Sequence, residues 1–139
     1  MAKRVLIVDD EPPTVRMIRM ALEGEQLQTT TARNGAEALL AIESEPPDLV
    51  ILDVMMPVMD GFETLRLLRK NQKTRSLPVM MLTARTEDED VLRAWMTGVD
   101  LYLTKPFTIE ELLIATRRIL AAAPNNAGNG DEVPPSACP

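Results

Sequence analysis

The stretch LVILDVMMPVMDG, at residues 49–61, decides the fold of this 139-residue chain. Its first four residues are apolar, the next is the carboxylate Asp53, and the turn signal Asp60-Gly61 closes it. An apolar run without alternation is typical of a strand that is covered on both faces. A strand that is covered on both faces tolerates a charge only where it ends. We therefore expect Asp53 at the carboxyl end of this strand rather than in its middle.

The same pattern recurs along the chain. The apolar runs VLIV, VMML and LYL lie at residues 5–8, 79–82 and 101–103, and the threonine-rich LQTTTA at 27–32 suits a sheet edge. Stretches with the apolar spacing of amphipathic helices lie between these runs. The order of strand and helix, repeated five times, predicts an α/β fold with a parallel five-stranded sheet and helices on both faces.

Local signals mark where several helices begin and end. Pro12-Pro13 favours a helix start. Gly98 suits the end of the fourth helix. Thr108, followed three residues later by Glu111, predicts a capping box at the start of the last helix.

Composition and charge exclude several classes of function. The net charge of -6 disfavours direct nucleic-acid binding, because phosphate contacts need Lys and Arg. The chain has no His, which excludes His-based catalysis, and its one Cys, Cys138, excludes an intrachain disulfide. The N-terminal apolar run is too short for a signal peptide or a membrane span. We therefore expect a cytoplasmic protein that does not contact membrane.

The length of the chain suits one domain with a real core. Its helical and strand periodicity ends near Pro124, after which Asn, Gly, Pro and Ser dominate. We predict a domain over residues 1–122 and a disordered tail over residues 123–139. The tail equally suits the start of a linker to a further domain.

Polar side chains follow four of the predicted strands. Asp9 and Asp10 follow the first strand, Asp53 the third, Thr83 the fourth and Lys105 the fifth. The carboxyl ends of parallel strands lie at the same end of the sheet, and ligands of such folds bind there. Three neighbouring carboxylates repel one another, and Mg²⁺, which prefers oxygen ligands, relieves that repulsion. The pattern predicts a Mg²⁺ site with Asp10 and Asp53 as direct ligands and Asp9 bound through water.

The same residues supply the parts for phosphorylating an aspartate. The Asp53 carboxylate is a possible nucleophile that would form an aspartyl phosphate. Mg²⁺ and Lys105 would then balance the charge of the phosphoryl oxygens, and the Thr83 hydroxyl would donate a hydrogen bond to them. Taken singly, Thr83 is more simply a helix cap and Lys105 a solvated charge, so the prediction depends on their joint position.

Four motifs together resemble the receiver domain of two-component response regulators, a CheY-like family. They are VDDE at residues 8–11, LDVMMPVMDG at 52–61, LTA at 82–84 and YLTKPF at 102–107. The resemblance covers about residues 3–122. It implies a doubly wound, flavodoxin-like (βα)5 fold with the strand order 2-1-3-4-5, which is a property of the family and not a deduction from spacing.

The resemblance also implies a role for each matching position in the acidic cluster. Asp53 is similar to the phosphoacceptor. Asp9 and Asp10 are similar to the acidic pair that holds Mg²⁺, and the backbone carbonyl of Met55 is similar to a further ligand of the ion.

Four more positions match residues that, in this family, contact the phosphoryl group or respond to it. Lys105 is similar to the lysine that pairs with it, and the family implies a cis bond between Lys105 and Pro106. Thr83 is similar to the switch hydroxyl that moves toward the phosphate. Tyr102 is similar to the aromatic residue that turns inward when that hydroxyl moves.

Two positions depart from the commonest pattern of the family. Leu101 stands where an acidic residue often precedes the switch aromatic, and Trp95 places a large ring on the fourth helix. Both are expected near the face of the fourth helix, fifth strand and fifth helix, where receivers usually dimerise or meet partners. We expect Trp95, Leu101 and Tyr102 to bind a partner protein there, because aromatic residues often anchor interfaces. A phosphorylation-dependent dimer is one form of this contact, and packing of Trp95 on its own helix is the simpler alternative.

The function implied is a phosphorylation-controlled signalling switch in a two-component phosphorelay, and not an enzyme beyond its own phosphotransfer and slow dephosphorylation. A histidine kinase or a His phosphotransfer protein would donate the phosphoryl group, since this chain has no His. We expect a stand-alone regulator that acts by protein contact and has no DNA-binding domain.

Three alternatives remain beside this reading of the residues. A phosphohydrolase of the haloacid dehalogenase type needs a second Asp two residues after the nucleophile, where this chain has Met55. A flavin-binding flavodoxin-like protein needs a phosphate-binding first loop, where this chain has DDEPP at residues 9–13. A degenerate receiver would act only as an interaction module. The five intact site positions argue against this alternative.

Overall fold

The computed structural model describes residues 2–84 and 95–122. Its elements follow one another as β1 (Arg4–Val8), α1 (Pro12–Glu23), β2 (Gln28–Ala32), α2 (Gly35–Ser44), β3 (Leu49–Asp53), α3 (Gly61–Lys70), β4 (Val79–Thr83), β5 (Leu101–Thr104) and α5 (Ile109–Ala122). Residues 95–97 are helical and form the described part of the fourth predicted helix. The remainder of that helix and the predicted tail lie outside the described residues.

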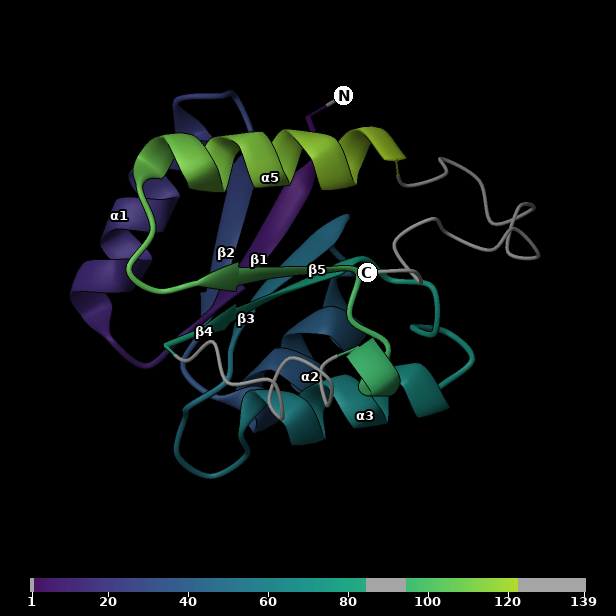
Figure 1. Ribbon diagram of the computed structural model, residues 1–139. Helices are drawn as coiled ribbons and strands as arrows, with labels where there is room; N and C mark the ends of the chain where they lie inside the picture. The colour runs from purple at the N-terminus through teal and green to yellow at the C-terminus, as the bar shows by residue number, and fades with distance from the viewer. Residues whose placement is uncertain (1, 85–94, 123–139) are drawn as a thin grey trace.

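The strands form one five-stranded parallel sheet in the order β2-β1-β3-β4-β5 (Figure 1). This order confirms the expected α/β fold, including the strand order that the family resemblance implies. The threonine-rich strand lies at one edge, as its composition indicates. It begins at Gln28, and Leu27 belongs instead to the turn after α1, where its N–H donates to the carbonyl of Leu22.

Helices cover both faces of the sheet, with α1 and α5 on one side and α2 and α3 on the other (Figure 1). Successive strand residues point to opposite faces. In β1, Val5 and Ile7 pack with α1 and α5, while Leu6 and Val8 pack with α2 and α3. Because both faces are buried, an uninterrupted apolar run is the pattern that a strand here requires.

The predicted helix signals are present in the structure. Prolines occupy the first turn of α1. Gly98 has a φ of 105°, in the left-handed region that favours glycine. At the start of α5 the Thr108 N–H donates to Glu111 Oε1 at 2.8 Å, and the Glu111 N–H donates to Thr108 Oγ1 at 3.0 Å. This reciprocal pair confirms the capping box.

Within residues 2–84 and 95–122, no helix has both the length and the apolar character needed to cross a membrane.

Candidate functional site

The acidic cluster forms where the carboxyl ends of β1 and β3 lie side by side. Val8 in β1 is paired with Leu52 in β3, so the residues that follow each come together. One carboxylate oxygen from each of Asp9, Asp10 and Asp53 lies within 4.8 Å of the other two. Asp9 and Asp53 are buried, with exposed fractions of 1% and 5%, and Asp10 is exposed. The structure therefore brings together the three acids that the sequence places at strand ends.

Lys105 reaches into this cluster from the end of β5. Its Nζ lies 3.2 Å from Asp53 Oδ1, 3.3 Å from Asp9 Oδ2 and 3.9 Å from Glu11 Oε1. Its backbone N–H donates to the carbonyl of Thr83 at 2.6 Å, and the bond to Pro106 is cis, as the family resemblance implies. The ammonium group is thus held between the two buried carboxylates.

Burial and mutual repulsion govern the charges of these groups. Burial, followed by the negative charge of Asp9, raises the pKa of Asp53 to about 6, although Lys105 acts in the opposite direction. Burial also raises the pKa of Asp9. Burial alone would lower the pKa of Lys105, but attraction to Asp53 and Asp9 outweighs it and raises that pKa. A second cation near the acids would favour their ionised forms.

The donor set fits a hard divalent cation. It consists of carboxylate oxygens only, and the exposed position of Asp10 leaves the cluster open to solvent on one side. Mg²⁺ prefers such oxygen ligands, takes few of them from protein and keeps several waters. Met55 lies in the segment that follows Asp53 and exposes 73% of its surface. Its carbonyl stays a predicted ligand.

Thr83 joins the acidic residues and Lys105 from the end of β4. We call Asp9, Asp10, Asp53, Thr83 and Lys105, at the carboxyl ends of the strands, the rim. Thr83 is 3% exposed, and it pairs in register with Thr104, the residue before Lys105. Asp53 pairs with Leu82, which places Thr83 one residue beyond the acid along the neighbouring strand. All five residues that the sequence assigns to the site therefore lie on one rim.

The loop between β3 and α3 is held tightly against the acid. A Cβ on Gly61 would lie 2.4 Å from the carbonyl oxygen of Asp53, so only glycine fits there. Asp60 caps α3, since its carboxylate accepts from the N–H of Glu63 at 2.9 Å. Asp60 therefore has the structural role of a helix cap. The Asp9 carboxylate instead accepts from the N–H of Glu11 at 3.0 Å and stays in the cluster.

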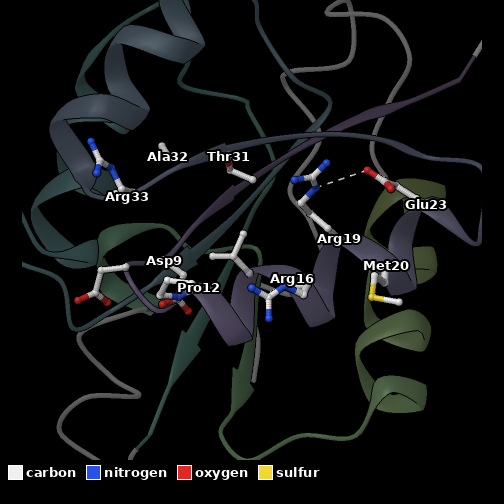
Figure 2. A pocket seen from close by; sticks show the side chains of 11 residues that line it. Asp9, Pro12, Arg16, Arg19, Met20, Glu23, Thr31, Ala32 and Arg33 are labelled. Atoms are coloured by element: carbon white, nitrogen blue, oxygen red, sulfur yellow. Dashed lines mark ion pairs between the residues drawn. The ribbon is translucent and has the colours of Figure 1, made fainter.

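A groove of about 380 Å³ runs from the acidic cluster along α1 and the end of β2 (Figure 2). It begins at Asp9 and Asp10, and three arginines that sequence reasoning did not single out contribute to its lining: Arg16, Arg19 and Arg33. Two of them are already paired, Arg19 with Glu23 and Arg33 with Glu37. The spacing of Arg16 and Arg19 on one helix was the only signal for this feature in the sequence.

The three residues predicted to bind a partner do not share one face of the sheet. Trp95 and Tyr102 are partly buried and pack with the α2 and α3 side of the core. Leu101 is also partly buried but packs with the α1 and α5 side. Adjacent strand residues point in opposite directions, which explains the separation of Leu101 from Tyr102.

Residues 5–117 match the family described as the response regulator receiver domain. The chain belongs to this family. It is 44% identical over 116 residues to the probable transcriptional regulatory protein TcrX of Mycobacterium tuberculosis, a match that covers 84% of this chain and 49% of that protein. The chain spans about half the length of the curated relatives it matches.

Solved structures show the same likeness. The signal receiver domain of a signal transduction histidine kinase from Syntrophus aciditrophicus has a TM-score of 0.84 at 35% identity, with 91% of this chain and 96% of that chain covered. The chemotaxis response regulator CheY4 of Vibrio cholerae has a TM-score of 0.82 at 34% identity, with 86% and 99% covered. Receiver domains are phosphorylated by histidine kinases and bind Mg²⁺ through acidic residues.

Proposed function

We propose that this receiver domain is a phosphorylation-controlled switch whose phosphoacceptor is Asp53. The observation that carries the proposal is the Lys105 ammonium held 3.2 Å from Asp53 and 3.3 Å from Asp9, inside a cluster of three carboxylates. Isolated surface acids do not need such an arrangement. A phosphoryl acceptor does, because its product carries additional negative charge that cations must balance.

In the proposed reaction, an Asp53 carboxylate oxygen attacks the phosphorus of a phosphohistidine. A P–O bond forms, the P–N bond breaks, and the histidine of the donor leaves with the electron pair and takes up a proton. Lys105 balances charge on the transferred group, and the Thr83 hydroxyl donates to one of its oxygens. Asp9, Asp10, Asp53 and the Met55 carbonyl would hold Mg²⁺, which supplies further charge compensation when bound.

The donor is a histidine kinase or a His phosphotransfer protein, and the receiver is not an enzyme with turnover of its own. A phosphohydrolase of the haloacid dehalogenase type would need an acid/base group where Met55 stands, and Met55 has none. A purely degenerate receiver is disfavoured by the geometry of the rim.

The matches cover only 49% and 56% of the first two relatives that are named as transcriptional regulatory proteins. Any DNA binding in those proteins need not involve the matched half. We propose that this chain itself acts through protein contact, because its net charge of -6 disfavours phosphate backbones. A stand-alone role and a cytoplasmic location stay predictions.

Intact mass after incubation with acetyl phosphate tests the proposed acceptor. The wild type should gain one phosphoryl group when Mg²⁺ is present and none when it is chelated. Asp53→Asn should gain none. Asp60→Asn is the matched control, because asparagine caps a helix as well as aspartate does, and it should behave like the wild type. A gain that persists in Asp53→Asn would refute the assignment.

The proposed output surface contains Trp95, Leu101 and Tyr102, which are all partly buried, and the last two belong to β5. A phosphorylation-dependent dimer through this surface would be detected by sedimentation with and without acetyl phosphate. Trp95→Ala should weaken the dimer at least tenfold. Self-association that is unchanged in Trp95→Ala would remove Trp95 from the surface.

A further inference from the structure

Gly35, the first residue of α2, lies against the loop that follows β3. This loop, residues 54–60, joins β3 to α3. The Gly35 N–H donates to the Met59 carbonyl at 3.2 Å. The loop is also closed at its base, where the Gly61 N–H donates to the Val54 carbonyl at 2.9 Å. The loop is therefore attached to the fold at its base and, through Gly35, at a second point.

The loop holds an unfavourable backbone conformation at Val58. Val58 has a φ of 71°, in the left-handed region, where a β-branched side chain is strained. The Met59 N–H donates to the Pro57 carbonyl at 2.7 Å, so Val58 is the central residue of a three-residue turn of a rare type. The Val58 side chain is 82% exposed, so burial does not offset the strain. A strained conformation of this kind persists only where the contacts around it hold it in place.

No side chain fits at position 35 while this contact is kept. A Cβ on Gly35 would collide with Thr64 Oγ1, and it would lie 2.9 Å from Met59 Cγ and 3.0 Å from the Met59 carbonyl oxygen. Thr64 has no room to move aside, because it is 0% exposed and its hydroxyl donates to the Asp60 carbonyl at 2.8 Å. The helices α2 and α3 lie side by side on the same face of the sheet (Figure 1). A side chain at position 35 would therefore push the start of α2 away from the loop.

The same loop contains Met55, two residues after the proposed phosphoacceptor, and the Met55 carbonyl is the proposed metal ligand from the backbone. Just before it, the Val54 N–H donates to the Leu82 carbonyl at 2.9 Å and continues the pairing of β3 with β4. Beyond that point the path of the loop is set by its own turn and by its attachments. A loop that is released from Gly35 can relax its strained turn, and the Met55 carbonyl then moves with it.

We propose that Gly35 is a positioning residue for Mg²⁺: its close contact with Met59 keeps the strained loop in the conformation that presents the Met55 carbonyl to the ion. The inference rests on the proposed function, because it concerns the metal site of that function. Gly35 acts through the loop and not by contact with the ion. A ligand that is held in place before binding raises affinity, because less conformational freedom is lost when the ion binds.

The test variant is Gly35→Ala, and Gly24→Ala is its matched control. Gly24 has an ordinary helical φ of -63°, and a Cβ there would lie 3.4 Å from its nearest neighbours, which is an ordinary contact. Calorimetric titration measures Mg²⁺ binding. Intact mass with acetyl phosphate, over a range of Mg²⁺ concentrations, measures the rate of phosphorylation.

In Gly35→Ala the dissociation constant for Mg²⁺ should rise at least fivefold, whereas Gly24→Ala should stay within twofold of the wild type. The phosphorylation rate of Gly35→Ala at saturating Mg²⁺ should stay within twofold of the wild type, while the half-saturating Mg²⁺ concentration rises in parallel with the dissociation constant. A variant that is merely less stable would lose folded protein without a change in the Mg²⁺ affinity of the folded fraction, and that result would overturn the proposal.

A second substitution tests whether the collision with Thr64 is the cause. Thr64→Ala removes the hydroxyl that a Cβ at position 35 would meet. Gly35→Ala combined with Thr64→Ala should therefore bind Mg²⁺ at least twofold more tightly than Gly35→Ala alone. Thr64→Val fills the same space with a methyl group, so its combination with Gly35→Ala should not restore binding. Equal Mg²⁺ affinity in the two double variants would overturn the steric basis of the proposal.

Hydrogen exchange in the wild type keeps the proposal testable if Gly35→Ala does not fold. Coupling between two sites is reciprocal, so Mg²⁺ must strengthen the contact of Gly35 with Met59 if that contact favours Mg²⁺ binding. Saturating Mg²⁺ should therefore slow exchange of the Gly35 amide at least threefold more than exchange of the Gly24 amide, which donates to the Met20 carbonyl at 3.1 Å. Equal slowing of the two amides, or none, would overturn the inference.

Failure of the proposed function would give a different result. A wild type that takes up no phosphoryl group would refute the proposed switch and this inference with it. Unchanged Mg²⁺ affinity in a Gly35→Ala variant that still accepts a phosphoryl group would overturn this inference alone.

Discussion

At the scale of single residues, ionisation of the buried Asp53 lowers the stability of the folded protein. Burial and the neighbouring Asp9 raise its pKa to about 6, above the ordinary value of 3.8. The folded state therefore favours the protonated form, and the stability that this provides below about pH 4 is lost as the pH rises through 6. In the proposed switch, the buried position of Asp53 is a case of stability given up for function.

Asp53→Asn should accordingly be more stable than the wild type at pH 7 without Mg²⁺. The shift of about two pKa units sets an upper bound of about 3 kcal/mol on the gain. The gain should vanish near pH 4, where both proteins carry a neutral group at this position. Urea unfolding at a series of pH values measures it, and an advantage that stays constant from pH 4 to 7 would contradict the pKa assignment.

Lys105 should compete with Mg²⁺ for the same carboxylates. Lys105→Met should therefore bind Mg²⁺ severalfold more tightly at pH 8, yet accept a phosphoryl group at least tenfold more slowly, because one cation that balances the phosphoryl oxygens is lost. Calorimetric titration and time-resolved mass measurement report the two effects. Lys73→Met, at an exposed position, is the control. Weaker Mg²⁺ binding in Lys105→Met would show that Lys105 organises the acids instead.

At the scale of elements, α5 contains one polar group that its surroundings do not satisfy. The Thr116 hydroxyl is buried and has no hydrogen-bond partner in the described part of the chain. Thr108, at the start of the same helix, is satisfied on both sides of its capping box. The two threonines therefore predict opposite responses to removal of the hydroxyl.

Thr116→Val should stabilise the protein by about 1 kcal/mol, because valine has nearly the same shape and carries no buried polar group. Thr108→Ala should destabilise it by about 1 kcal/mol, because a cap is lost. Thermal unfolding of both variants gives the comparison. Destabilisation by Thr116→Val would reveal a partner for this hydroxyl in solution.

The sequence predicts features that depend on local patterns better than features that depend on contacts between distant segments. Strands, helix caps and the rim depend on local patterns and on one rule about parallel strands, so Asp9 and Lys105, 96 residues apart, could be placed together. Arg69 and Asp100 could not. Their contact depends on the path of backbone carbonyls between α3 and β5, and no periodicity encodes that path. Leu101 and Tyr102 pack with opposite sides of the core, because adjacent strand residues point in opposite directions, and their joint role in partner binding stays a prediction.

At the scale of the whole molecule, the proposed Mg²⁺ site would couple metal binding to folding. Mg²⁺ relieves repulsion that exists only when the three acids are brought together by β1 and β3. It should raise the melting temperature, by an amount that corresponds to about 2.7 kcal/mol when its concentration is one hundred times the dissociation constant. Asp10→Asn should lose most of this effect, whereas K⁺ at equal ionic strength should not reproduce it. Equal stabilisation of Asp10→Asn would place the metal elsewhere.

The same view explains why the two ends of β4 and β5 differ in character. Near the carboxyl ends lies Lys105, whose pKa Asp53 and Asp9 raise in spite of its burial, whereas near the amino ends Arg69 is paired with Asp100 at 2.8 Å.

The central claim is most directly tested by chemical trapping of the phosphorylated residue. Borohydride reduces an acyl phosphate to an alcohol, which converts a phosphorylated aspartate into homoserine. After incubation with acetyl phosphate and Mg²⁺, reduction and peptide sequencing by mass spectrometry should find homoserine at residue 53 and at no other aspartate. Homoserine at Asp9, Asp10 or Asp60, or a phosphorylated protein that yields no homoserine, would contradict the assignment of Asp53 as the phosphoacceptor.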